Sequence, residues 1–180
     1  MEPLFFENTK ELKKEKERLE KKLNVKIEIT GKKVIIEGEP LDEYEAITIL
    51  DAMRFGFSAG IALTLKDTDF VFKKISIRDY TRRKNLEDVR ARIIGTKGTT
   101  KRTIEEISGC KINLHKNEVG VIGPVEAVEE ATTALTNLIR GSKQANIYRF
   151  LEGINAGKRD EGLGLKEKRS EKTSAKYQLK

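Results

Sequence analysis

An internal repeat constrains the fold of this chain more than any other feature of its sequence. When the chain is shifted by 85 positions against itself, apolar residues and turn residues fall on one another without a gap. Ile27 then falls on Ile112, and Gly38 falls on Gly123. Each copy has the pattern of a charged helix, two short strands and a longer helix. The repeat therefore predicts two related α+β units rather than one larger domain.

The spacing of apolar residues predicts the same order of elements in both copies. Alternation at every second residue indicates strands. The expected strands are residues 4–6, 25–29 and 34–37 in the first copy and residues 70–77, 110–114 and 119–122 in the second. Helical periodicity predicts a short helix over residues 86–94 and longer helices after Pro40 and Pro124, because proline is tolerated in a first turn. Cys110, the only cysteine, falls on an inward strand position and is expected in the core.

We expect each long helix to turn an apolar face towards its core, because apolar residues recur there at helical spacing. In the first copy these residues are Leu41, Tyr44, Ile47, Leu50 and Phe55. In the second copy they are Val125, Val128, Ala131, Leu135, Leu138 and Ile139.

Residues 93–109 form the most specific motif of the chain, IIGTKGTTKRTIEEISG. A Gly-x-x-Gly sequence, Gly95 to Gly98, opens directly into an amphipathic helical segment that ends at Gly109. Glycine lets backbone approach a ligand closely, and the N–H groups at a helix start bind anions. At the corresponding place the first copy has residues 10–13, which contain no glycine. A phosphate-binding turn is therefore expected in the second copy only.

Positive charge is concentrated beside this turn. The chain has a net charge of +7. Residues 82–102 contribute +6 and residues 158–180 contribute +4, whereas residues 1–66 carry −1. A clustered basic surface is typical of proteins that bind nucleic acid. The distribution assigns such binding to the second copy.

The order of elements around the turn resembles the type I KH domain, in which a Gly-x-x-Gly loop clamps about four nucleotides of single-stranded RNA. The resemblance implies an α+β fold of two tandem type I KH domains. Each would have a three-stranded sheet with helices packed on one face, and the first copy would lack the Gly-x-x-Gly loop. The expected ranges are 1–68 for the degenerate first domain, 69–157 for the second, and 158–180 for a basic, disordered tail.

Over about residues 2–156 the chain resembles the tandem-KH ribosome-assembly factors called partner-of-Nob-one or Dim-two-like, of archaeal type. Three segments carry this resemblance: RARIIGTKGTTKRTIEEISG (90–109), ISIRDY (75–80) and YRFLE (148–152). It implies a cytoplasmic, non-enzymatic protein whose second domain binds single-stranded RNA near the 3′ end of small-subunit ribosomal RNA. The implied partners are the endonuclease that matures this end, Nob-one, and the alpha subunit of translation initiation factor two. One departure is residues 142–146, where relatives tend to have proline and glycine.

The expected RNA contacts fall into three groups. Loop and backbone contacts are assigned to Gly95, Thr96, Lys97, Gly98, Arg90, Arg92, Lys101 and Arg102. Ile94 is a candidate floor for bases, whereas core packing is favoured for Ile104. Lys111, Asn113 and His115 alternate with the apolar residues of their strand, so we expect them on its outward face, where KH domains read base edges.

Two other functions remain open from the sequence. One alternative is a protein adaptor, which the nearly neutral first copy favours, and another is a KH regulator of other RNAs. A P-loop enzyme is disfavoured because Lys97 precedes Gly98, whereas that motif ends in Gly-Lys-Ser/Thr. We expect no catalytic residue, metal ligand or cofactor, because His115 is the only histidine and has no partner residues nearby in the sequence. No apolar run is long enough to suggest a membrane span.

Overall fold

A computed structural model describes residues 3–162, with only the backbone of residues 159–162. The elements of the first unit are β1 (Leu4–Phe5), α1 (Lys10–Leu23), β2 (Lys26–Thr30), β3 (Lys33–Glu37), α2 (Pro40–Phe55) and α3 (Ala59–Ala62). Those of the second are β4 (Phe70–Ser76), α4 (Leu86–Ile94), α5 (Thr99–Ser108), β5 (Lys111–His115), β6 (Glu118–Pro124), α6 (Val125–Arg140) and α7 (Gln144–Gly162). Short 3₁₀ segments are Leu63–Lys66, Ile77–Tyr80 and Thr96–Gly98.

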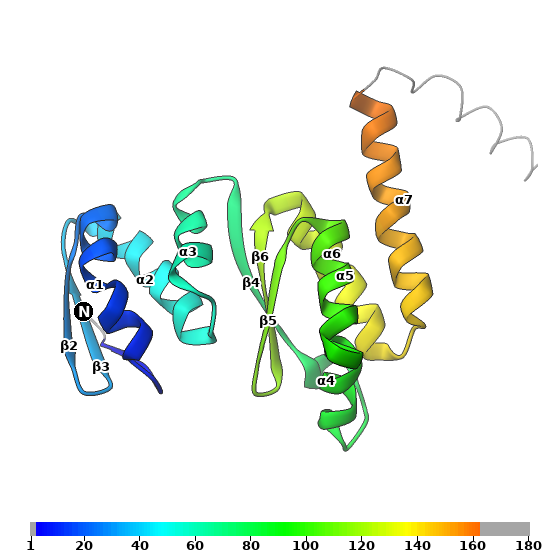
Figure 1. The fold of residues 1–180 in the computed structure, drawn as a ribbon, viewed down its shortest axis with the longest axis horizontal. Helices are drawn as coiled ribbons and strands as arrows, with labels where there is room; N and C mark the ends of the chain where they lie inside the picture. Colours follow the sequence, from blue (N-terminus) through cyan, green and yellow to red (C-terminus); the bar gives the residue numbers. More distant parts are fainter. Residues whose placement is uncertain (1–2, 163–180) are drawn as a thin grey trace, which may run out of the picture.

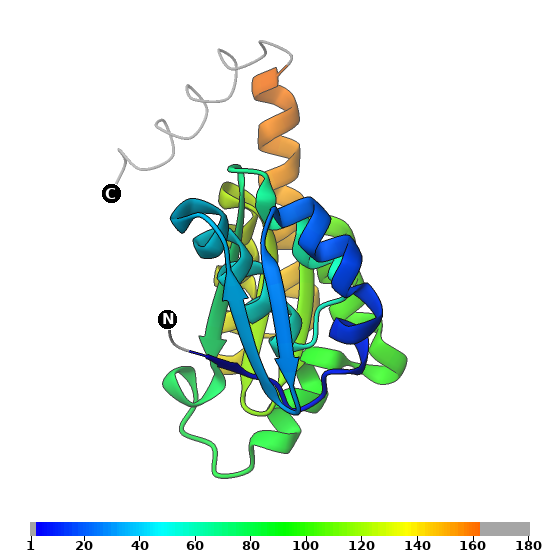
Figure 2. The same ribbon diagram turned by 90° about the vertical axis from the view of Figure 1, so that its left-hand side faces the viewer.

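The predicted strands and helices are present, with ends that differ by one or two residues. Both sheets are three-stranded and antiparallel, with the order β1-β3-β2 in the first unit and β4-β6-β5 in the second. The elements are layered along the long axis as first sheet, first helices, second sheet, second helices and α7 (Figure 1). Figure 2 shows the first sheet from its open side, in front of the second unit. α7 continues past the expected boundary at residue 157, and residues 163–180 of the predicted tail lie outside the described residues.

The repeat of 85 positions is reproduced in the register of the sheets. Ile27 pairs with Ile36 in the first unit, and Ile112 pairs with Val121 in the second. A helix carboxylate accepts the outward N–H of the edge strand in both units: Glu20 Oε1 from Ile27 N at 2.8 Å, and Glu105 Oε1 from Ile112 N at 2.7 Å. These four positions are related by the same shift, so local backbone geometry repeats as well as the apolar pattern.

The two units differ on either side of this shared part. The first unit passes from β1 directly into α1, with no helix in the place of α4. After the long helix, both units begin another helix at equivalent positions, Ala59 and Gln144. In the first unit this helix is the single turn α3, whereas in the second it is the 19-residue α7. The first unit is therefore a shortened version of the second.

The first unit packs its long helix against the open face of the second sheet. A Cβ placed on Gly120 would lie 2.6 Å from Phe55 Cε1 and 3.0 Å from Phe57 Cε2, so the aromatic rings fill the space where a side chain would be. Phe72 meets both rings edge-on, at centroid distances of 5.7 Å. The second sheet is thus covered on both faces, and residues 119–123 of β6 are buried without alternation.

This packing corrects the apolar face predicted for α2. Leu50 and Phe55 are buried, as expected, but Leu41, Tyr44 and Ile47 are 69%, 70% and 41% exposed. Because α2 lies between two sheets, its buried surface also includes residues outside the predicted face. These are Ala46, Ile49, Ala52 and Met53. On α6 the expected apolar residues are buried, except that Val125 at its start is 48% exposed.

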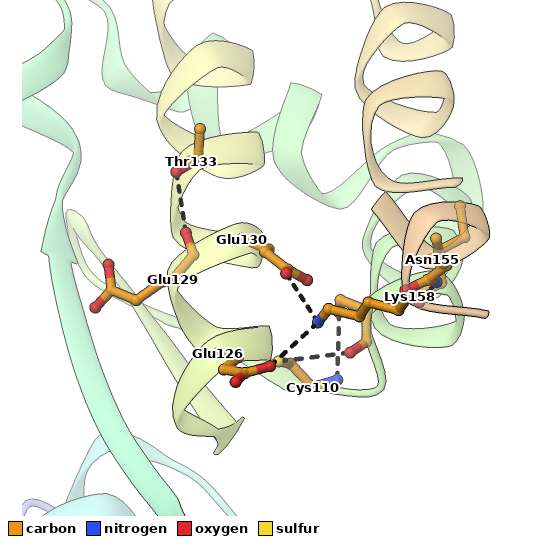
Figure 3. Close-up of polar contacts among 9 residues, drawn as sticks. Cys110, Glu126, Glu129, Glu130, Thr133, Asn155 and Lys158 are labelled. Atoms are coloured by element: carbon orange, nitrogen blue, oxygen red, sulfur yellow. Dashed lines mark hydrogen bonds and ion pairs between the residues drawn. The ribbon is translucent and has the colours of Figure 1, made fainter. Parts of the chain in front are cut away.

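The end of α7 is held against α5 and α6 by polar contacts (Figure 3). Asn155 Nδ2 donates to the carbonyl of Ile107 at 2.6 Å. Lys158 Nζ lies 2.8 Å from Glu130 Oε1 and 3.8 Å from Glu126 Oε2. The hydrogen bond to Glu130 raises the pKa of Lys158. This contact therefore stabilises the fold below the ordinary lysine pKa and is lost as pH rises through the raised value.

Cys110 lies beneath this end of α7, and its side chain is fully buried, as the sequence predicted (Figure 3). Burial raises the pKa of the thiol. A protonated, inaccessible thiol reacts slowly with disulfide reagents, so its labelling rate reports opening of the structure above it.

We expect Asn155→Ala to accelerate labelling of Cys110 by an aromatic disulfide reagent about fivefold, because one lost hydrogen bond of about 1 kcal/mol makes opening of α7 more frequent. The matched control is Asn146→Ala, which removes an exposed asparagine from the same helix. Equal labelling rates in the two variants would show that α7 does not protect the thiol.

Candidate nucleic-acid interface

The Gly-x-x-Gly sequence forms a tight turn between α4 and α5. The φ angles of Gly95, Lys97 and Gly98 are 75°, 53° and 77°. Side chains other than glycine are strained in this region, so the two glycines allow a turn that other residues would resist. Lys97 adopts the strained conformation at the tip, where its side chain is exposed.

Gly95 is also required by close packing. A Cβ placed there would lie 2.1 Å from Thr100 Oγ1 and 2.7 Å from Thr100 N. A Cβ on Gly98 would meet nothing within 4 Å, so that glycine is needed for its conformation alone. The turn is therefore pressed against the first turn of α5, which fixes its position relative to the helix.

The N-terminus of α5 faces this turn without a side-chain cap. Thr99, which stands at the first position, donates its hydroxyl to the carbonyl of Thr96 at 2.7 Å instead. The first N–H groups of a helix have no partner within the helix, and they carry the positive end of its dipole. The turn and the helix start together present backbone donors suited to a phosphate group.

Two residues that the sequence analysis missed support the turn from below. Thr100 is only 3% exposed, and its Oγ1 accepts a hydrogen bond of 2.7 Å from Gln144 Nε2. Gln144 begins α7 and also lies 3.5 Å from the carbonyl of Arg92. Gln144 lies within residues 142–146, where the chain departs from the family pattern, and this departure was the signal that could have indicated it. The sequence did not show that its partner is Thr100, 44 positions away.

The predicted cations lie in different surroundings. Lys97 and Arg102 are exposed, and Lys101 is half-buried on the first turn of α5. Arg90 Nη1 donates to the carbonyl of Lys116 at 3.0 Å, which ties α4 to the turn between β5 and β6. Lys97, Lys101 and Arg102 thus surround the loop, while Arg90 stands at the hairpin.

Arg92 is engaged elsewhere. Its Nη2 donates to the carbonyls of Gly141 and Ser142, at 3.0 and 2.8 Å. These carbonyls terminate α6, where a cation is favoured by the helix dipole. The structure therefore gives Arg92 a packing role between α4 and the α6–α7 turn, which its neighbourhood in the sequence did not indicate.

Ile94 and Ile104, the two isoleucines considered for base contact, differ in their exposure to solvent. Ile94 is 40% exposed at the end of α4, next to the loop, where it can contact a base. Ile104 is fully buried within the core of the second unit. Core packing, which was favoured for Ile104, is confirmed.

The outward residues of β5 do not all face solvent. Lys111 is exposed, but Asn113 and His115 point at the first unit. A Cβ on Gly56 would lie 2.7 Å from Asn113 Nδ2, and the His115 ring lies 5.6 Å from that of Phe55. The sheet face on which we expected base contacts is occupied by α2 at these two positions. The alternation was predicted correctly, but its outward face is an interface between the units.

The free edge of β5 still offers backbone groups. The N–H of Ile112 donates to Glu105, and the N–H of Leu114 donates to the side-chain Oδ1 of its neighbour Asn113 at 3.0 Å. β5 is the outer strand of its sheet, so the outward backbone of Leu114 is unpaired by any strand. Edge backbone groups of this kind can pair with base edges.

Across residues 3–158, the part of the chain whose side chains the structure describes, no three His, Cys, Asp or Glu side chains gather as metal ligands would. None of the helices within residues 3–162 has the length and apolar character needed to cross a bilayer.

Comparison with known proteins identifies the second unit. The family model for the second KH domain of PNO1, described as a eukaryotic type KH domain (KH-domain type I), matches residues 71–156. A KH domain-containing protein of Methanocaldococcus jannaschii is 33% identical over 76% of this chain and 63% of its own length. RNA-binding protein pno1 of Ixodes scapularis is 30% identical over 61% of this chain and 48% of its own length. The chain thus spans from just under half to just under two thirds of the length of these curated relatives.

Solved structures extend the likeness across both units. Dim2p from Pyrococcus horikoshii OT3 is 34% identical, with a TM-score of 0.70 over 77% of this chain and 86% of that chain. A chain in the a/eIF2alpha-aDim2p-rRNA complex of the same organism is 30% identical, with a TM-score of 0.76 over 87% of this chain and 94% of that chain. A chain with this level of identity over nearly the full length of such a structure belongs to the PNO1/Dim2p family of KH-domain proteins.

Proposed function

We propose that this protein is a non-enzymatic RNA-binding assembly factor that holds single-stranded RNA at the loop Gly95–Gly98. The observation that carries the proposal is the geometry of this loop, a glycine turn pressed against an uncapped helix N-terminus. Exposed Lys97 and Arg102 add charge on the same surface. The pno1 relatives are named RNA-binding proteins, which agrees with this proposal.

We propose ribosomal RNA as the target, specifically the 3′ end region of the small-subunit RNA. Support comes from the solved complex in which a related chain is associated with rRNA and a/eIF2alpha. By the same reasoning the alpha subunit of initiation factor two is a partner. The endonuclease Nob-one and a cytoplasmic location rest on the family resemblance alone. Because the chain spans only part of its curated relatives, these assignments concern the shared part.

We further propose that the chain is a tandem of KH domains, with a degenerate copy at 1–68, an RNA-binding copy from residue 69 and a basic tail. The expected boundary at 157 moves towards the C-terminus, because α7 continues to Gly162 and Lys158 pairs with Glu130. The shared sheet order and register support a common origin of the two copies. The first copy has neither the glycines nor a helix equivalent to α4, so it has no loop corresponding to Gly95–Gly98.

Not all predicted contacts are retained in this proposal. We assign RNA contact to Arg90, Ile94, Gly95, Thr96, Lys97, Gly98, Lys101, Arg102 and Lys111. Arg92 and Asn113 are assigned to packing, because their polar groups already lie against other parts of the protein. His115 lies at the junction between the units and is considered separately below.

A second candidate function, protein adaptor, is favoured by one observation. Leu41, Tyr44 and Ile47 form an exposed apolar stripe on α2. Exposed apolar surface on one helix face is common at protein interfaces. The adaptor role is compatible with RNA binding, because this stripe lies on the first unit and the loop on the second.

Replacing Thr96 and Lys97 together with Asp should weaken binding of single-stranded RNA at least tenfold, because two carboxylates would lie against phosphate. The dependence of affinity on salt should also become less steep, since a phosphate contact is lost. Fluorescence anisotropy with labelled RNA at several salt concentrations measures both effects. Circular dichroism should show an intact fold, because both side chains are exposed.

The matched control is Thr9→Asp with Lys10→Asp, the same residue types and charge change at the start of α1 in the first unit. This variant should keep its affinity apart from a small general electrostatic loss. Equal losses in the two variants would mean that net charge, rather than the loop, governs binding.

The support beneath the loop gives a second prediction. Gln144→Ala and Thr100→Val each remove the hydrogen bond that joins α7 to the loop, and each should weaken RNA binding about fivefold. The double variant should lose no more than the single ones, because both remove the same interaction. Asn146→Ala on the same helix is the control. Additive losses would indicate that the two residues act independently.

A further inference from the structure

Two cavities lie at the junction of the two units rather than at the loop. One cavity of about 280 Å³ is lined by residues of both units. A second of about 230 Å³ adjoins it and shares Glu7, Arg54 and His115. We call the two together the junction cleft. Neither unit alone forms this cleft, because its walls include the end of β1 and the residues after it, the end of α2 and the β5–β6 hairpin.

The walls of the junction cleft combine ring faces with a guanidinium group. Phe5 is 62% exposed at its mouth. His115 is half-buried, and its ring lies 5.6 Å from that of Phe55. Arg54 stands between the two cavities. Aromatic rings and arginine planes are the surfaces on which unpaired bases stack.

The charges of the cleft favour a base over a free phosphate, because carboxylates outnumber the lysine and arginine side chains. The carboxylates are Glu7, Glu11, Asp51 and Glu118, and the cations are Arg54, Lys74 and Lys116. Lys116 Nζ lies 2.6 Å from Glu7 Oε1, and this contact lowers the pKa of Glu7. Asp51 contacts both Arg54 and Lys74. A phosphate alone would meet these carboxylates as well as the cations. A base can stack on the rings while the carboxylates accept hydrogen bonds from its exocyclic amine.

The cleft is continuous with the proposed RNA path through the β5–β6 hairpin. Arg90, which contacts the carbonyl of Lys116, lies five residues before Gly95 on α4. At about 1.5 Å per residue this is roughly 7 Å along the helix. Lys116 therefore belongs both to the edge of the loop surface and to the wall of the cleft. A strand that leaves the loop along α4 reaches the cleft at this hairpin.

We propose that the junction cleft receives a base of the same RNA strand, beyond the nucleotides held by the loop, so that the first unit contributes Phe5 and Arg54 to RNA binding. The inference rests on the proposed RNA-binding function. It assigns the degenerate unit a part in that function although this unit has no glycine loop. His115 then contacts RNA on the outward face of β5, the face on which base reading was expected, at the point where this face meets the first unit.

The test compares the affinities of a four-nucleotide cytidine RNA and of two eight-nucleotide RNAs, in which four adenosines extend the cytidines on the 5′ or on the 3′ side. Phe5→Ala and Arg54→Ala should leave binding of the short RNA unchanged. Binding of one of the two longer RNAs should weaken about tenfold, because stacking on the cleft is lost. A longer RNA with abasic extension nucleotides should bind the wild-type protein and the variants alike.

Matched controls are Tyr44→Ala, an exposed aromatic residue of α2 outside the cleft, and Arg18→Ala, an exposed arginine of α1. Both should bind the longer RNAs like the wild-type protein. If Phe5→Ala and Arg54→Ala do so too, with their folds intact by circular dichroism, the inference is overturned.

The same series separates failure of the inference from failure of the proposed function. The loop variant Thr96→Asp with Lys97→Asp should lose the short RNA as well as the longer ones. If this variant still binds the short RNA, the loop proposal fails. The cleft proposal is tested separately, by the difference in affinity between the longer and the short RNAs in the Phe5→Ala and Arg54→Ala variants.

Discussion

The structure depends on a contact in which aromatic rings of one unit occupy the space of a missing side chain in the other. Phe55 and Phe57 pack against Gly120 in the centre of the second sheet, so this sheet is buried on both faces. Burial of this apolar surface, at about 25 cal/mol per Å², joins the units into one body. It also determines which residues of the second unit remain available to a ligand, because α2 covers part of β5.

Local patterns were sufficient to predict the elements and their repetition. Alternation and helical periodicity located the strands and helices, since these signals depend on neighbouring residues. The glycines of the loop were recognised because its backbone conformation favours glycine. The close contact of Gly95 with Thr100 lies within the same segment, so it too depends on neighbouring residues. The buried position of Cys110 likewise followed from strand alternation.

What the sequence did not reveal were contacts between distant segments. Leu41 and Tyr44 have the spacing of core residues, yet they are exposed because α2 lies between two sheets. Asn113 was correctly placed on the outward face of β5, but the presence of the first unit on that face depends on tertiary packing. The hydrogen bond between Gln144 and Thr100 is also a contact between distant segments, since it joins two helices across 44 positions.

The contact at Gly120 also has a consequence for how many such units one chain can join. By the shift of 85 positions, the first sheet has Ile35 where the second has Gly120, so it has no space to receive a preceding copy. The second long helix has Arg140 and Ser142 where the first has Phe55 and Phe57, so it has no aromatic rings to insert into a following one. A further copy would therefore find no counterpart of this aromatic–glycine contact at either end of the pair.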